Sequence, residues 1–227
     1  MVKSGITLAF AVFAVGLGRE PVLQHGGPEN TIPAGIVSGT VTLESAPRAR
    51  RTVDRYSGST ATVMEQSLSA IVYLKGTIPG PVPVGYDSNP TMSQQDSAFV
   101  PSTLAVMAGG TVSFPNGDAL FHNVFSYSGP KHFDLGRYPQ GDSKSVVFDE
   151  PGLVEVFCEV HDHMAGAILV TENPFHAVVS EDGSFSISGV PPGEYTLVAW
   201  HPEHDEEERT IAVTDGATTH IEVELQR

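Results

Sequence analysis

The chain alternates short apolar stretches with turn-forming residues, and this pattern predicts β-strands almost throughout. Residues 36–43 and 70–75 place β-branched residues in alternation or in a short apolar run, as half-buried or buried strands do. From residue 91 onward, short strand-like stretches recur at regular spacing between Gly-, Pro- and Asn-rich turns. The further predicted strands are 91–95, 102–107, 111–114, 144–148, 153–158, 165–170, 175–180, 184–187, 195–200, 208–213 and 218–225.

Composition agrees with an all-β protein. The chain has 227 residues, of which 23 are Gly and 17 are Pro, and only 17% are charged. Such a chain has many turn signals and few stretches suited to long amphipathic helices. Its length is enough for two small domains, each with a core of its own.

The first residues have the pattern of a signal peptide, predicted over residues 1–18. Lys3 precedes an apolar run at residues 6–17, and the run is shorter than the roughly 20 apolar residues that span a bilayer. We therefore expect export to the periplasm or the exterior, with a flexible leader at residues 19–34. No later segment is long and apolar enough to predict a membrane span in the mature chain.

The net charge of −15 makes nucleic acids and anionic lipids poor partners for this chain. The acidic excess lies after residue 76, so a basic partner would be attracted to that part. Four arginines at positions 48, 50, 51 and 55 form a basic patch, which we interpret as a solvated loop.

The candidate chemistry lies in the heptapeptide Cys-Glu-Val-His-Asp-His-Met, which runs from Cys158 to Met164. A thiolate, an imidazole and a thioether are a soft, mixed donor set that suits copper. Cys158 is the only cysteine, and metal ligation would protect its thiol in an oxidising compartment. If the loop containing His122 converges on this heptapeptide, two imidazoles, a thiolate and a weak thioether give the ligands of a blue-copper electron-transfer site.

Two alternatives concern the ligands and the metal. His163 is a second imidazole of the heptapeptide, but it is directly beside Met164, and adjacent residues could hardly bind the same ion. We therefore prefer His161 to His163. Zinc is the alternative metal, since a Cys-His-His set can bind it; the thioether argues for copper.

Residues 91–170 resemble a cupredoxin, a blue copper protein of the plastocyanin and amicyanin kind. The matching motifs are Phe99-Val-Pro101, Thr111-Val-Ser-Phe-Pro-Asn116, His122-Asn-Val124 and Cys158-x-x-His161-x-x-Met164. The resemblance implies that one type 1 copper ion is bound by His122, Cys158, His161 and Met164. It also implies that Asn123 ties the two ligand loops together and tunes the thiolate.

The same resemblance implies a route for the electron. The edge of His161 would reach the surface through an apolar patch, for which Ala165, Ala167 and Phe125 are candidates. Four protein donors leave no open position for a substrate, and no catalytic motif is present, so we expect no enzyme activity. The expected function is outer-sphere one-electron transfer with a redox protein such as a cytochrome or dehydrogenase. The alternative is a copper-binding or structural module of a cell-envelope assembly.

The C-terminal part has another resemblance. Residues 182–197 resemble the carboxypeptidase regulatory-like domain, a transthyretin-like β-sandwich, but 55 residues after position 172 are few for that fold. Residues 39–47 and 70–75 resemble its opening strands. We therefore predict a discontinuous domain, 35–76 plus 173–227, with a cupredoxin domain at 77–172 inserted. The fold class predicted is all-β: a Greek-key cupredoxin sandwich plus a second, smaller sandwich.

His201 and His204 lie beside four consecutive acidic residues at positions 205–208. We interpret this stretch as a solvated acidic turn, with a second metal site as the alternative.

Overall fold

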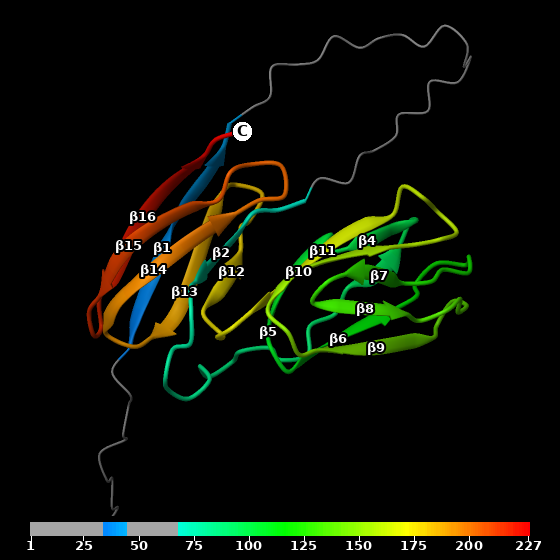
Figure 1. Cartoon of the computed structure of the whole chain (residues 1–227), viewed down its shortest axis with the longest axis horizontal. Helices are drawn as coiled ribbons and strands as arrows, with labels where there is room; N and C mark the ends of the chain where they lie inside the picture. The colour runs from blue at the N-terminus through cyan, green and yellow to red at the C-terminus, as the bar shows by residue number, and fades with distance from the viewer. Residues whose placement is uncertain (1–33, 45–67) are drawn as a thin grey trace, which may run out of the picture. The chain divides into compact units, whose positions relative to one another are not determined.

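The computed structural model describes residues 34–44 and 68–227 (Figure 1). The described residues form strands and no helix, which confirms the all-β fold class. Consistently, no helix among them is long and apolar enough to cross a membrane. Three predictions concern residues outside the described ranges and stay predictions. They are the signal peptide, nearly all of the flexible leader, and the solvated loop that contains the four arginines.

Seven strands, here called the outer strands, come from the two ends of the described chain. β1 pairs with β13 and β16 in one sheet, and β2 pairs with β12 and β14 in another, which β15 completes. Figure 1 shows β1, in blue, beside β16, in red. The outer strands are β1 (Gly35–Leu43), β2 (Ile71–Leu74), β12 (His176–Val178), β13 (Ser184–Val190), β14 (Gly193–Trp200), β15 (Glu207–Val213) and β16 (Thr218–Leu225).

The outer strands share one apolar core because their inward positions are apolar. Val37 and Val41 of β1 lie in the same buried cluster as Phe185 of β13 and Val223 of β16. Gly39 permits the close parallel pairing of β1 and β16, since a Cβ there would lie 1.6 Å from the carbonyl oxygen of Ile221.

The nine remaining strands, here called the central strands, surround a second buried cluster that includes Phe99, Phe114, Phe148 and Val156. The five-stranded sheet has the order β5-β11-β10-β7-β8, and the pairs β6-β9 and β3-β4 complete the set. The central strands are β3 (Ser93–Gln95), β4 (Ala98–Val100), β5 (Thr103–Met107), β6 (Gly110–Pro115), β7 (Phe125–Ser128), β8 (Lys131–Asp134), β9 (Ser143–Phe148), β10 (Gly152–Phe157) and β11 (Ala165–Thr171).

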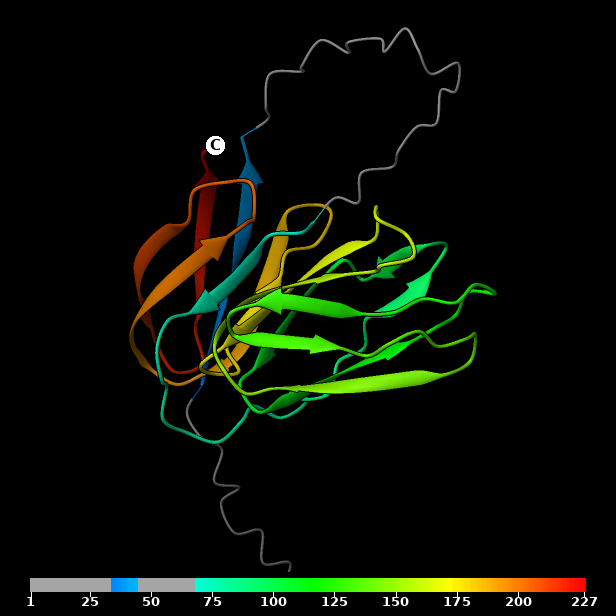
Figure 2. The same cartoon turned by 45° about the vertical axis from the view of Figure 1, so that its right-hand side comes forward.

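Three central strands were not predicted from the sequence: β4, β7 and β8. β7 and β8 form an antiparallel hairpin whose two strands lie side by side in green in Figure 2. Only one of these eight residues, Ser126, is buried, and Tyr127 is 74% exposed. The sequence of β7, Phe-Ser-Tyr-Ser, does alternate aromatic and polar residues, but its buried position is a serine and not an aromatic residue. This alternation and the turn signal Gly129-Pro130 could have predicted the hairpin.

His176 of β12 is a half-buried histidine whose environment resists protonation. Its Nδ1 lies 2.9 Å from the Thr171 hydroxyl, and its ring packs edge-on against Tyr86. Burial lowers the pKa of His176 from 6.5 to about 4, despite hydrogen bonds to the backbone of Asn173 and Ala105 that act to raise it. The folded protein thus keeps this ring neutral at pH values where the unfolded chain binds a proton.

We predict that this histidine makes the protein less stable in mild acid. The free energy of unfolding should fall as the pH drops from about 6.5 to about 4 and should change no further through this group below that range. The contribution is at most roughly 3 kcal/mol, and partial exposure of the ring reduces it. Urea unfolding at pH 7, 5.5 and 4 should show a shallower pH dependence for His176→Asn than for wild type. His220→Asn, at an exposed position, is the matched control, and equal slopes in all three proteins would contradict the prediction.

Candidate metal centre

The two predicted ligand loops meet at one end of the five-stranded sheet. β10 pairs with β7 through Phe157 and Phe125, so Cys158, which follows β10, lies beside the segment that leads into β7. His122 in that segment is fixed by two backbone hydrogen bonds with Tyr138, of 3.3 and 2.9 Å. The strand pairing thus brings together residues that are 36 positions apart in the chain.

Three of the predicted donors form a compact cluster. Sγ of Cys158 lies 3.7 Å from Nδ1 of His122 and 4.0 Å from Nδ1 of His161, and the two Nδ1 atoms are 3.0 Å apart. His122 and Cys158 are buried, and His161 is partly exposed. Two imidazole nitrogens and a thiol sulfur that converge in a buried place, with no carboxylate among them, form a donor set that fits a soft or borderline metal ion.

Met164 closes the loop that carries Cys158 and His161. Its N–H donates to the carbonyl of His161 at 3.0 Å, and its own carbonyl accepts from the N–H of Cys158 at 3.3 Å. Its side chain is fully buried in the same apolar cluster as Cys158. The tight loop therefore carries a fully buried thioether at Met164 and a partly exposed imidazole at His161.

His163 lies outside the cluster. Its side chain is about half exposed, and its Nδ1 is 3.9 Å from the carboxylate of Asp162. Its ring centroid is 6.0 Å from that of His161. Within the described residues, the group able to hold a metal ion comprises His122, Cys158 and His161 and does not include His163.

Asn123 links the two loops. Its side-chain oxygen accepts a hydrogen bond of 2.7 Å from the N–H of Glu159, the residue after Cys158, and the side chain is buried. This carboxamide fixes the spacing between the segment of His122 and the segment of the thiol.

Asp118 is a site residue that sequence reasoning missed. Its Oδ2 lies 2.8 Å from Nε2 of His122, and its carboxylate also accepts the N–H groups of Asp96 and Ser97. Burial acts to raise the pKa of Asp118, but these N–H groups and His122 outweigh it and hold the pKa below its usual value. The carboxylate accepts Nε2–H and so leaves Nδ1 of His122 with its lone pair toward the thiol. Only its position four residues before His122 could have drawn attention to it.

The surroundings of His161 disfavour protonation of its imidazole. Partial burial, followed by the neighbouring rings of His122 and His163, lowers the pKa of His161 below its usual value. Its Nδ1 lone pair therefore stays available to a metal ion at lower pH than that of a free histidine.

The apolar surface near the cluster differs from the one predicted. Ala167 is only 1% exposed because it lies within β11 and faces the interior, so its assignment to a surface patch is wrong. Ala165 and Phe125 are partly buried. Three exposed apolar side chains instead flank the ligands in the chain: Leu120 and Phe121 before His122, and Val160 before His161.

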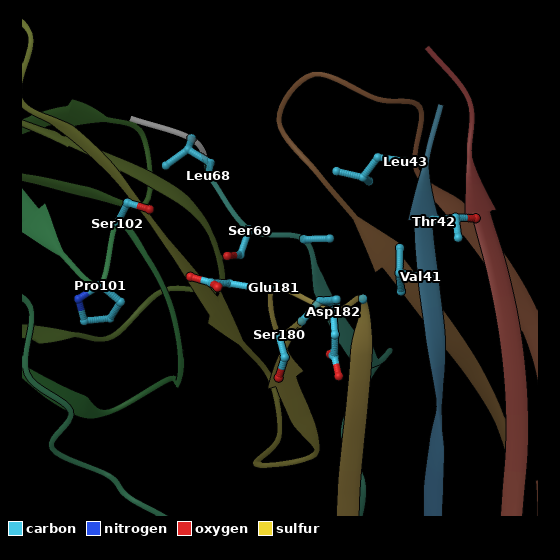
Figure 3. A pocket seen from close by; sticks show the side chains of 13 residues that line it. Val41, Thr42, Leu43, Leu68, Ser69, Pro101, Ser102, Ser180, Glu181 and Asp182 are labelled. Carbon is cyan, nitrogen blue, oxygen red and sulfur yellow. The ribbon is translucent and has the colours of Figure 1, made fainter. Parts of the chain in front are cut away.

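A pocket of about 710 Å³ lies elsewhere (Figure 3). It is lined by residues such as Val41, Ser102 and Glu181, and none of the predicted ligands borders it. The pocket therefore takes no part in the metal centre.

Comparison with protein families assigns both parts of the chain. Residues 87–171 match the model of copper binding proteins of the plastocyanin/azurin family. These residues form a plastocyanin/azurin copper-binding domain. Residues 164–226 match the carboxypeptidase regulatory-like domain. Both predicted resemblances are thereby confirmed, and the cluster of His122, Cys158 and His161 with Met164 is consistent with a type 1 copper site.

Several solved structures are similar to part of this chain. A novel purple cupredoxin from Nitrosopumilus maritimus is 24% identical, with a TM-score of 0.33, and the match covers 36% of this chain and 98% of that one. Amicyanin from Paracoccus versutus is 22% identical, with a TM-score of 0.34, covering 44% and 96%. A copper-containing nitrite reductase from Thermus scotoductus is 20% identical, with a TM-score of 0.35, covering 58% and 28%. The assignment rests on the family matches and not on these likenesses.

Proposed function

We propose that this protein is an exported type 1 copper protein that exchanges single electrons with a redox protein and catalyses no reaction of its own. The observation that supports this most directly is the convergence of two Nδ1 atoms and one thiol sulfur, all within 4.8 Å of one another. Its proposed compartment, the periplasm or the exterior, rests on the signal-like pattern of residues 1–18.

Each ligand has a role that follows from its place. His122, Cys158 and His161 would hold the copper ion, and the buried Met164 would act as the weak fourth donor. Copper, when bound, supplies a one-electron couple. The buried side chains around Cys158 exclude water, and a rigid loop that keeps the donors in one arrangement would lower the reorganisation needed for electron transfer.

The surface around His161 suits a transient protein partner. Leu120, Phe121 and Val160 are 52%, 58% and 40% exposed and adjoin the ligands in the chain. We propose that these side chains form one apolar patch, of the kind that is typical of an interaction site. A cytochrome or dehydrogenase with a basic rim would also be attracted by the net charge of −15.

A second candidate function is a copper-binding module of a cell-envelope assembly, and the regulatory-like domain favours it. We propose that this domain is discontinuous, 35–76 plus 173–227, with the cupredoxin domain at 77–172 between its parts. The pairing of β1 with β13 and β16, and of β2 with β12 and β14, supports that boundary. Limited proteolysis within residues 77–90 tests it: release of the N-terminal piece from a still-folded remainder would overturn the proposal.

Spectroscopy and voltammetry of the copper-loaded protein separate the two candidates. A carrier should show intense visible absorption, the paramagnetic signature of a copper–thiolate site and a reversible one-electron wave. Colourless protein that binds Cu(I) and resists oxidation would support the binding module and overturn the carrier.

We predict that Asp118 lowers the reduction potential of the copper centre. Its carboxylate lies 2.8 Å from the outer nitrogen of His122, so its negative charge stabilises the more positive, oxidised ion. Asp118→Asn should raise the potential by on the order of 50 to 100 mV. The matched control is Asp162→Asn, because that carboxylate follows His161 directly in the chain but is fully exposed and is screened by solvent. Voltammetry that finds equal shifts in both variants would contradict a specific role for Asp118.

A further inference from the structure

We propose that His201 and His204 form a second cation site, suited to a borderline divalent ion such as Zn²⁺ or Cu²⁺. Both lie in the turn Trp200-His-Pro-Glu-His204 that follows β14, and the N–H of His204 donates to the carbonyl of His201 at 3.2 Å. Their Nδ1 atoms are 2.8 Å apart, and the ring planes are at 79° to each other. This site does not depend on the copper centre.

The outer nitrogens of the two rings define where the protons are. Nε2 of His201 lies 3.1 Å from the carbonyl oxygen of Leu68, and Nε2 of His204 lies 3.1 Å from the carbonyl oxygen of Glu44. A carbonyl oxygen only accepts hydrogen bonds, so both Nε2 atoms must carry the proton. In the neutral rings both Nδ1 atoms then carry a lone pair, and these two lone pairs face each other.

Two facing lone pairs at this distance repel each other, and a cation between them would turn this repulsion into attraction. The N–H of Glu203, 3.2 Å from Nδ1 of His201, donates to that atom but not to Nδ1 of His204. The cation can be a shared proton or a metal ion. His201 is only 6% exposed, and such burial disfavours a charged imidazolium ring.

The donor chemistry selects the metal class. Imidazole nitrogen suits Zn²⁺, Cu²⁺ and Ni²⁺ and not Ca²⁺ or Mg²⁺. His122 and His161 show the same arrangement in the copper centre, with Nδ1 atoms 3.0 Å apart and the Nε2 of His122 bonded to an acceptor. The turn is exposed at Glu203 and Asp205, so water molecules can complete the coordination of an ion held by two imidazoles.

A cation bound by His201 and His204 would link three segments of the chain. The two carbonyl groups belong to Glu44 and Leu68, which directly flank residues 45–67. A cation held between the imidazoles would therefore tie both flanks of that segment to the turn after β14, and it should raise the thermal stability of the whole chain.

Long-range ¹⁵N–¹H spectra of the imidazoles test the proposal in the full ¹⁵N-labelled chain at pH 7. Without metal, we expect both rings as Nε2–H tautomers. Stepwise addition of Zn²⁺ should shift Nδ1 of His201 and His204 and leave exposed His220 unchanged. Each ring gives its own signals in this spectrum. Zn²⁺ binding at the Cys158 centre, or its absence, is therefore observed separately from Zn²⁺ binding at His201 and His204.

The variants give a second readout. His204→Ala should weaken Zn²⁺ binding at this turn by roughly tenfold or more, and it should abolish the Zn²⁺-dependent rise in melting temperature that belongs to this site. His220→Ala is the control and should leave both unchanged. If one ring is an imidazolium in wild type and neither Nδ1 responds to Zn²⁺, the pair shares a proton and the proposal is overturned.

Discussion

Replacing Cys158 with serine is expected to abolish the intense visible absorption of the copper-loaded protein. Cys158 is the only cysteine, so no other residue can supply a thiolate to the cluster. A serine hydroxyl stays protonated near neutral pH and is a hard oxygen donor, which suits Cu(I) poorly. The affinity for Cu(I) should fall by roughly 100-fold or more because the thiolate is lost. Some binding should persist, since two imidazoles and a thioether remain. Absorption spectra and competition with a chromophoric Cu(I) chelator measure the two effects.

A packing control separates ligand loss from a damaged core. Cys158 is 3% exposed and lies in the apolar cluster of the central strands, where a hydroxyl is itself unfavourable. Val156→Ala opens a cavity two residues earlier, at a fully buried position of β10, without removing a donor. That variant should be less stable but should keep the visible band. A band that survives in folded Cys158→Ser would show that the thiol is not a ligand.

The sequence pointed to the residues that the structure brings together, His122, Cys158 and His161, but not to all of the strands that hold them there. Cys158 and Met164 were recognisable because their donor chemistry is rare and local. His122 was predicted through its motif, whereas its approach to Cys158 depends on the pairing of β7 with β10. β7 was not predicted, although Phe-Ser-Tyr-Ser alternates aromatic and polar residues, because that alternation spans only four positions. Strand pairing between distant segments leaves little trace in a single sequence.

Asp118 and Ala167 illustrate the same limit at the level of single side chains. Asp118 follows Asn116-Gly117 in what reads as an ordinary turn, and its role depends on Nε2 of His122 lying 2.8 Å away. Ala167 was assigned to a surface patch from its closeness to the ligands in sequence. Its place in β11 turns it to the interior, and the exposed apolar residues precede the ligands instead.

The two histidines of the heptapeptide provide the sharpest test of the ligand set. His161→Ala should lose the visible band and most copper affinity, because its Nδ1 lies 4.0 Å from Sγ of Cys158 and 3.0 Å from Nδ1 of His122. His163→Ala also removes an imidazole, two residues later, but from an exposed side chain outside the cluster. This variant should keep both the visible band and the copper affinity. Each variant is thus the other's control for the loss of a ring from this loop.

Copper titration followed by absorption decides between the two histidines. If His163→Ala loses copper and His161→Ala keeps it, the loop must rearrange on metal binding, and the ligand set is His122, Cys158 and His163. Such a rearrangement would have to break the hydrogen bond from the N–H of Met164 to the carbonyl of His161, which holds the loop closed. For that reason we expect His161 to be the ligand.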